Sequence, residues 1–297
     1  MSAPRRAPVP APALFMLSGL SQYLGAAVAV GLFAVMPATT VAWWRVLVSA
    51  VLLLAWRRPW RRRWTARNLA ASALFGVVLA GMNLLFYVAI DHLPLGTAVS
   101  LEYLGPVAVA AIAGRGARVR VAIALALLGV LSISGLGVDW SEPGTGVGVA
   151  FALAAGAAWA AYIVLGRRIA AGRSGLDSLA VGMAAGALVF APVVARTAGL
   201  AVGSPALLLG VVGVGVLSSL VPYAIEQVAL TRLPAPTFAL LTSLLPATSL
   251  LVGLVVLRQV PTAGEVLGLV LVSVAVALAS REGEAPNAAG PPRGTRH

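Results

Sequence analysis

Three ionisable side chains stand inside long apolar runs of this sequence: Arg45, Glu102 and Glu226. A charged group in the hydrocarbon region of a membrane is costly, so each is a candidate functional residue. A carboxylate there can carry a proton or bind a cation, and an arginine can balance it or bind a substrate carboxylate. The alternative is structural, because polar side chains also hold helices together. The remaining acidic residues are expected in loops or tails.

A proline follows three polar positions, Glu102 among them, by four residues. Because proline lacks an N–H, it leaves the carbonyl four residues earlier without its helical donor. Each such break places a free main-chain acceptor inside an apolar segment. The three pairs are Glu102 with Pro106, Ser218 with Pro222, and Thr242 with Pro246.

A second set of polar residues recurs at a fixed offset. Asn83 and Tyr87 are four residues apart and share one face of a helix. Tyr223 and Gln227 stand 140 residues later. These groups are candidates for hydrogen bonds that orient a zwitterionic solute, with helix–helix hydrogen bonds as the alternative.

The elements that position these residues are transmembrane helices. The chain has 297 residues, 60% hydrophobic and 10% charged, with a mean hydropathy of +0.97, whereas soluble domains have roughly 25% charged residues. An all-α integral membrane protein is predicted, since ten apolar runs can each cross about 30 Å of hydrocarbon. The ten runs are 13–35, 38–56, 68–90, 95–114, 119–138, 146–166, 176–196, 204–230, 235–257 and 262–280. In this reading Glu102 lies about 12 Å along its helix, near the bilayer centre.

All 21 basic residues are arginines, and the formal net charge is +12. Most of them fall in alternate connections and in the two tails, above all in the cluster at residues 57–67. This is the pattern of the positive-inside rule, so both termini are predicted to be cytoplasmic. The cluster is expected to bind lipid headgroups, and nucleic acid is not an expected partner.

An internal repeat joins the two halves of the chain. Residues 88–106 and 228–246 match at eight of 19 positions without a gap. Five predicted spans separate the copies, so the halves run through the membrane in opposite directions, as in many secondary transporters. A duplication without transport is the alternative. The predicted organisation is two inverted five-helix repeats, 13–138 and 146–280, between disordered tails, 1–12 and 281–297.

This organisation resembles the drug/metabolite transporter superfamily, in its EamA-type branch. The similarity is strongest in residues 81–110 and 218–247, and it includes "AWWRVLVSAVLLL" around Arg45 and "GAAWAAYIVLGRR". The resemblance implies a central cavity lined by spans 1, 3, 4, 6, 8 and 9. It adds Gln22, Trp159 and Tyr162 to the candidate residues.

The resemblance also implies a proton-driven exporter of small neutral amino acids, such as threonine or homoserine, in a bacterial inner membrane. Efflux of drugs or aromatic metabolites is the main alternative, followed by a membrane-embedded enzyme and a scaffold without a solute path. No cofactor or metal is expected, because the chain has two histidines, no cysteine and no nucleotide-binding or hydrolase motif. The expected partners are a small solute, the lipid bilayer and the proton.

Overall fold

The computed structural model describes residues 11–113, 116–133, 138–170, 175–223, 225 and 243–280. Every regular element within these ranges is a helix. Glu226, Gln227 and Thr242 lie outside the described residues, as does most of the second copy of the repeat. The two predicted tails also lie outside them, except that the first helix already begins at Ala11.

The helices follow the predicted apolar runs wherever the structure describes them. The first group is α1 (Ala11–Leu32), α2 (Ala38–Arg57), α3 (Ala66–His92), α4 (Leu95–Glu102), α5 (Leu104–Ala113) and α6 (Ala117–Ser132). The second group is α7 (Thr145–Ala170), α8 (Gly175–Phe190), α9 (Pro205–Gly215), α12 (Leu245–Val255) and α13 (Ala263–Ser280). Short 3-10 helices are η1 (Pro59–Arg61), η3 (Ala191–Val194) and η4 (Ala198–Gly203), and η5 (Val216–Leu220) is a π-helix.

Length and hydropathy mark several of these helices as membrane-spanning. Five helical stretches among the described residues are long and apolar enough to cross a bilayer: Ala38–Arg61, Ala66–His92, Thr145–Gly166, Gly175–Val194 and Pro205–Tyr223. Shorter apolar helices accompany them, at Met16–Leu32, Leu95–Val109, Leu245–Val255 and Ala263–Leu278. The prediction of an all-α membrane protein therefore holds for the described part of the chain.

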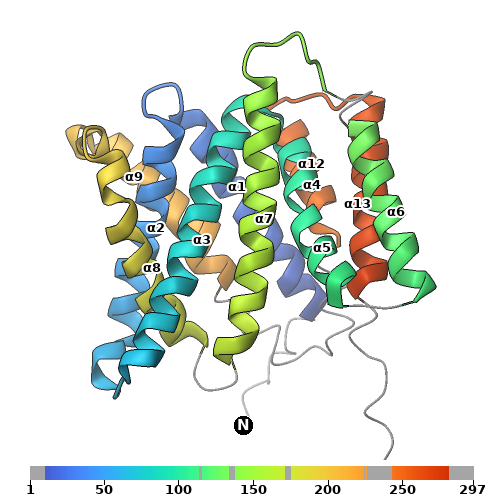
Figure 1. Cartoon of the computed structure of the whole chain (residues 1–297). Coiled ribbons are helices and arrows are strands. Elements are labelled where there is room, and N and C mark those ends of the chain that lie inside the picture. Colours follow the sequence, from blue (N-terminus) through green and yellow to red (C-terminus); the bar gives the residue numbers. More distant parts are fainter. Residues whose placement is uncertain are drawn as a thin grey trace, which may run out of the picture.

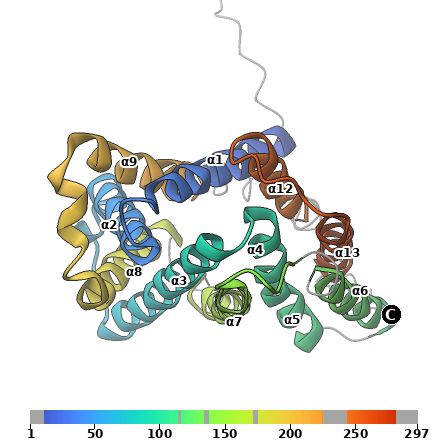
Figure 2. The same cartoon turned by 90° about the horizontal axis from the view of Figure 1, so that it is seen from above.

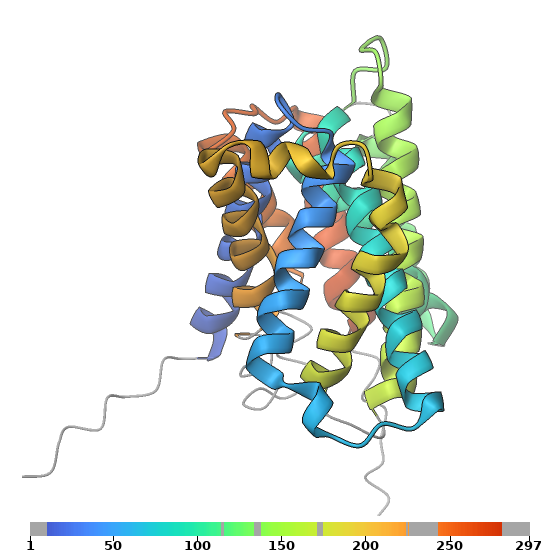
Figure 3. The ribbon, with the colours of Figure 1, turned by 90° about the vertical axis from the view of Figure 1, so that its left-hand side faces the viewer.

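Helices from the two halves interleave instead of forming separate lobes. Seen from above, α3 lies beside α7, α1 beside α12, and α6 beside α13 (Figure 2). The helices stand side by side with their connections at two opposite ends (Figure 1). Turned to the side, the η3 and η4 segment runs across one of these ends (Figure 3). Because each half supplies neighbours to the other, the helices pack as one unit.

Two glycine contacts mark close approaches between helices. A Cβ atom on Gly76 of α3 would overlap the main chain of Gly182 on α8. A Cβ atom on Gly156 of α7 would lie 2.8 Å from the carbonyl oxygen of Glu102. Helices in lipid associate by close van der Waals packing, which small residues permit. These glycines therefore fix α3 against α8, and α7 against the end of α4.

The expectation that the other acids lie in loops or tails is wrong for Asp177 and Glu265. Both are buried, in the first turns of α8 and α13. Asp177 accepts ion pairs from Arg57 and Arg62, each at 2.9 Å. Two cations and the positive end of a helix offset the cost of burying a carboxylate. Two arginines of the cluster predicted to bind headgroups thus also connect the end of α2 and the residue after η1 to α8.

Candidate functional site

The helix carrying Glu102 ends at that residue. Tyr103 separates α4 from α5, three residues before Pro106. Pro94 is the N-cap of α4, so the helix begins at Leu95, where the predicted run 95–114 also begins. Glu102 is 8% exposed. The interruption lets its side chain enter a cavity while its carbonyl packs on Gly156.

A second interruption lies at η5, which ends two residues before Pro222. In a π-helix the N–H groups bond carbonyls five residues back, and Pro222 has no N–H to give. Side chains from other helices supply the missing donors. Ser21 Oγ donates to the Leu217 carbonyl at 2.9 Å, and Arg45 Nη2 donates to the Ser218 carbonyl at 2.7 Å.

Arg45 reaches this segment from the middle of α2. Its Nε also donates to Ser219 Oγ at 2.9 Å, and its guanidinium lies 5.3 Å from the ring centroid of Tyr87. The ring face of an aromatic residue attracts a cation. A guanidinium has five N–H groups in a fixed fork. Two of them hold η5 in place, which leaves three for other acceptors.

One cavity of about 60 Å³ brings most of the candidate residues together. This is room for several water molecules. Helices α1, α2, α3, α4 and α7 and the segment after η5 each contribute to its wall. The candidates in the wall are Gln22, Arg45, Asn83, Glu102, Trp159 and Tyr223, and the other lining residues are Tyr23, Ala26, Met82 and Phe86.

Arg45 and Glu102 line this cavity without forming a direct ion pair, within the part of the chain that the structure describes. The Glu102 carboxylate accepts no hydrogen bond from a described residue either. Asn83 Nδ2 donates to the Leu79 carbonyl at 2.7 Å, so its amide oxygen and one N–H are left for a ligand. Such an arrangement can bind a small molecule with one anionic and one cationic group.

Two candidate aromatic residues lie behind the cavity wall. Tyr87 packs under the Arg45 guanidinium, and its buried hydroxyl has no hydrogen-bond partner among the described residues. Tyr162 stacks on Phe75, with ring centroids 4.6 Å apart, and does not line the cavity. Trp159, which does line it, packs edge-on against Tyr103 at 4.6 Å.

The prolines lie in the helices and not in the wall. Pro106 is in α5, Pro222 follows η5, and Pro246 is buried in the first turn of α12. Ser249 Oγ donates to the Pro246 carbonyl at 2.7 Å. Among the described residues no group of three or more His, Cys, Asp or Glu side chains gathers to hold a metal ion.

Comparison with known proteins gives the family. The model of the EamA-like transporter family matches residues 146–281. The threonine/homoserine exporter RhtA of Salmonella typhimurium (strain LT2) is 38% identical over 266 residues, which are 89% of this chain and 90% of that protein. RhtA of Escherichia coli (strain K12) is 37% identical over the same shares. The chain belongs to the EamA-like transporter family. The predicted resemblance is confirmed.

A solved structure supports the fold of this EamA-like transporter. It is described only as "Crystal structure of protein", and it matches with a TM-score of 0.58 over 90% of this chain and 96% of its own. Its sequence identity is 18%, so the likeness concerns the fold alone. Membership of a transporter family argues against the embedded-enzyme and scaffold alternatives.

Four lining residues of this EamA-like transporter were absent from the sequence-based set: Tyr23, Ala26, Met82 and Phe86. For two of them, the spacing from a candidate residue indicated that they face the cavity. Ala26 lies four residues after Gln22, and Phe86 lies three after Asn83, so each shares a face with a candidate. Apolar lining residues could not be recognised by type, because most residues of these helices are apolar.

Proposed function

We propose that this EamA-like transporter is a secondary active exporter of small amino acids, such as threonine or homoserine, in a bacterial inner membrane. Ten helices form two inverted repeats, residues 13–138 and 146–280, and the protein works by alternating access. Similarity to proteins named threonine/homoserine exporters over about nine-tenths of both chains supports the solute class.

One observation carries the proposal: Arg45 and Glu102 line one cavity and leave each other unpaired within the described residues. An amino acid carries a carboxylate and an ammonium on the same carbon. Arg45 binds the carboxylate with the N–H groups that η5 does not use, and Glu102 binds the ammonium. Gln22, Asn83 and Tyr223 offer hydrogen bonds to a hydroxyl on the solute side chain.

Proton coupling follows from competition at Glu102. A buried carboxylate needs one positive partner, either the solute ammonium or a proton, because an isolated charge in the interior is costly. Arrival of a proton therefore releases the solute, and departure of the proton prepares the site for the next one. This exchange moves solute outward as protons move inward. Glu226, outside the described residues, is a second candidate for the same role.

In the orientation that we propose for the protein in the membrane, both termini lie in the cytoplasm. The connection holding Arg57, Arg61 and Arg62 and the first residues of α1 lie at one end of the molecule (Figure 1). The loop holding Asp139 and Glu142 lies at the opposite end. Positive residues accumulate on the cytoplasmic side of membrane proteins, which supports this orientation.

Efflux from proteoliposomes tests the solute and the coupling together. Vesicles are loaded with labelled threonine or homoserine, and a pH gradient is applied. The parent protein is expected to release solute faster with the gradient, and Glu102→Gln to lose this response. Glu142→Gln, which removes an exposed acid from a loop, is the matched control. Absence of flux through the parent would refute the solute class, and equal responses of parent and Glu102→Gln would refute the coupling.

Aromatic solutes are the second candidate, because four aromatic residues line the cavity: Tyr23, Phe86, Trp159 and Tyr223. Such rings stack on a flat solute and favour its burial. The same vesicles are loaded with tryptophan or with a cationic dye. Faster release of these compounds than of threonine would favour efflux of drugs or aromatic metabolites over export of small amino acids.

A further inference from the structure

Another buried acid, Glu265, lies outside the solute cavity and contacts the helix that carries Glu102. Glu265 is 6% exposed and lies in the first turn of α13. Its Oε2 accepts hydrogen bonds from Thr262 N at 2.8 Å and Thr262 Oγ1 at 3.2 Å, and its own N–H donates to Thr262 Oγ1 at 3.2 Å. These bonds form a capping box, which supplies the hydrogen-bond donors for Oε2 of the carboxylate.

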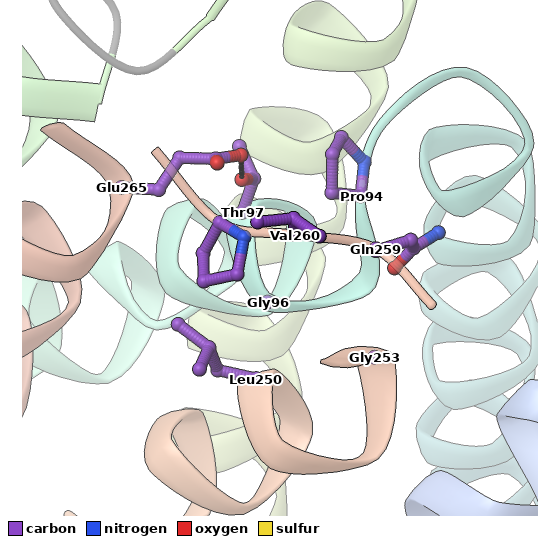
Figure 4. Close-up of a pocket in the computed structure, with 9 residues that line it drawn as sticks. Pro94, Gly96, Thr97, Leu250, Gly253, Gln259, Val260 and Glu265 are labelled. Atoms are coloured by element: carbon purple, nitrogen blue, oxygen red, sulfur yellow. Dashed lines mark hydrogen bonds between the residues drawn. The ribbon is translucent and has the colours of Figure 1, made fainter. Parts of the chain in front are cut away.

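The other carboxylate oxygen reaches across to α4. Thr97 Oγ1 donates to Glu265 Oε1, and the two side chains point toward one another in Figure 4. These residues are 168 positions apart, on opposite halves of the chain. The helix cap of α13 therefore doubles as an acceptor for the third residue of α4.

Gln259, in the loop before α13, makes a second link to the same turn. Its Oε1 accepts from the Leu95 N–H at 3.0 Å. That N–H is the first of α4 and has no helical acceptor. Pro94, the N-cap of α4, makes no side-chain capping bond. The α12–α13 loop thus caps α4 in place of a local residue.

α4 is a short helix, and these two bonds help to hold it in position. It has eight residues, from Leu95 to Glu102, and helices of this length depend on tertiary contacts. Its outer turn is held by Gln259 and Glu265, and the cavity residue Glu102 stands at its other end. Tyr103 interrupts the helix directly after Glu102, so α4 can tilt there without bending α5.

We define the α4 clamp as the Thr97–Glu265 and Leu95–Gln259 hydrogen bonds. We propose that this clamp keeps the cavity closed toward the end of the molecule at which α4 begins. Gln259 and Glu265 are positioning residues that act through Glu102. Opening toward this end requires both bonds to break, so that α4 tilts away from α12 and α13. This role presupposes the alternating access proposed above, but it is independent of the solute.

Cysteine labelling tests the clamp, because the natural chain contains no cysteine. Ala26→Cys places a thiol in the cavity wall. A membrane-impermeant maleimide is applied from each side of the membrane in turn. Thr97→Val, which removes the hydroxyl at nearly constant volume, is expected to raise the labelling rate by roughly threefold to tenfold, the shift that loss of one hydrogen bond produces. The increase is expected from the clamp end only.

Two variants keep the outcome decisive. Ser132→Ala is the control, since Ser132 Oγ donates to the Gly264 carbonyl at 3.0 Å, at the start of α13, and not to a residue of α4. It is expected to label like the parent, as is Thr97→Ser. If Thr97→Val does not fold, Gln259→Met removes the other bond and is read in the same way.

Equal labelling of Thr97→Val and Ser132→Ala, or acceleration from both sides, would overturn the clamp. Vesicles that export no amino acid but show side-specific labelling would refute the proposed solute and leave the clamp standing. Vesicles that export threonine, together with labelling that Thr97→Val does not change, would support the proposed solute and refute the clamp.

Discussion

Arg45 Nη2 donates to the main-chain carbonyl of Ser218 at 2.7 Å. Pro222, four residues after Ser218, cannot supply the helical N–H that this carbonyl would otherwise receive. A buried carbonyl without a donor is costly, so the arginine stabilises a break that the proline creates. The same residue lines the cavity that Glu102 also lines. Arg45 therefore links the solute site to the π-helical segment η5.

Replacing Arg45 by lysine is expected to damage both stability and transport. Lysine keeps the charge, but its ammonium cannot reproduce the fork that reaches Ser218 and Ser219 together. Loss of one charged hydrogen bond should lower the free energy of unfolding by about 2 kcal/mol. Thermal unfolding in detergent and threonine flux are the measurements. Arg196→Lys, at an exposed loop position, should change neither. A fully active Arg45→Lys would contradict the role of the fork.

Two glycine-to-alanine substitutions should change the free energy of unfolding in opposite directions. Gly76→Ala places a Cβ atom on the main chain of Gly182, and neither backbone can yield without moving a helix. Overpacking of this kind costs about 1 to 3 kcal/mol. Gly213→Ala on α9 meets nothing within 4 Å and should stabilise the helix by about 0.5 to 1 kcal/mol. Unfolding midpoints of the two variants test this, and a Gly76→Ala variant as stable as the parent would contradict the packing of α3 on α8.

Asp177→Asn should weaken the connection between α8 and the segment after α2. It leaves Arg57 and Arg62 without their carboxylate, but these side chains are 26% and 55% exposed, so water offsets part of the loss. A decrease of about 2 kcal/mol in the free energy of unfolding is expected, below the value for a fully buried pair. Arg62→Gln should cost less than about 1 kcal/mol.

Arg61→Gln is the matched control for this pair, because Arg61 belongs to the same cluster and is exposed without contacting Asp177. The unfolding midpoint is measured at low and high salt. Asp177→Asn should remain destabilising in high salt, since its carboxylate is buried, whereas the effect of Arg62→Gln should shrink. Equal losses for Arg61→Gln and Arg62→Gln would refute the ion pair.

Asp139, in the loop before α7, gives a prediction in pH. Ser141 Oγ and Ser141 N donate to its carboxylate at 2.6 Å and 2.9 Å, and these bonds hold the pKa of Asp139 below its usual value. A lowered pKa favours the loop conformation above the ordinary carboxyl pKa, and this contribution is lost as the pH falls through the lowered value.

Ser141→Ala should therefore raise the pKa of Asp139 toward its ordinary value, as measured by carboxyl-carbon NMR. Thr145→Val is the control. Thr145 Oγ1 donates to the main-chain carbonyl of Asp139 at 2.9 Å and not to the carboxylate. Thr145→Val should therefore leave the pKa of Asp139 unchanged. A Ser141→Ala variant that titrates like the parent would exclude the side-chain bond as the cause.

Polar candidates could be recognised from the sequence where their surroundings were apolar. Arg45, Asn83 and Glu102 stand out by type in such runs, and all three line the cavity. Ala26 and Phe86 do not stand out, because residues facing lipid and residues facing the cavity have the same types. Glu265 was misplaced because an acid in the first turn of a helix has the same sequence context as an acid in a loop.

The sequence by itself determined that the protein is helical and membrane-embedded, and that its helices break near Pro106 and Pro222, since hydropathy and proline act within a few residues. Tertiary structure alone decided what fills those breaks. Arg45 meets the Ser218 carbonyl across 173 residues, and Glu265 meets Thr97 across 168. Such partners depend on which helix faces pack together, and lipid, as apolar as the helices themselves, does not select those faces.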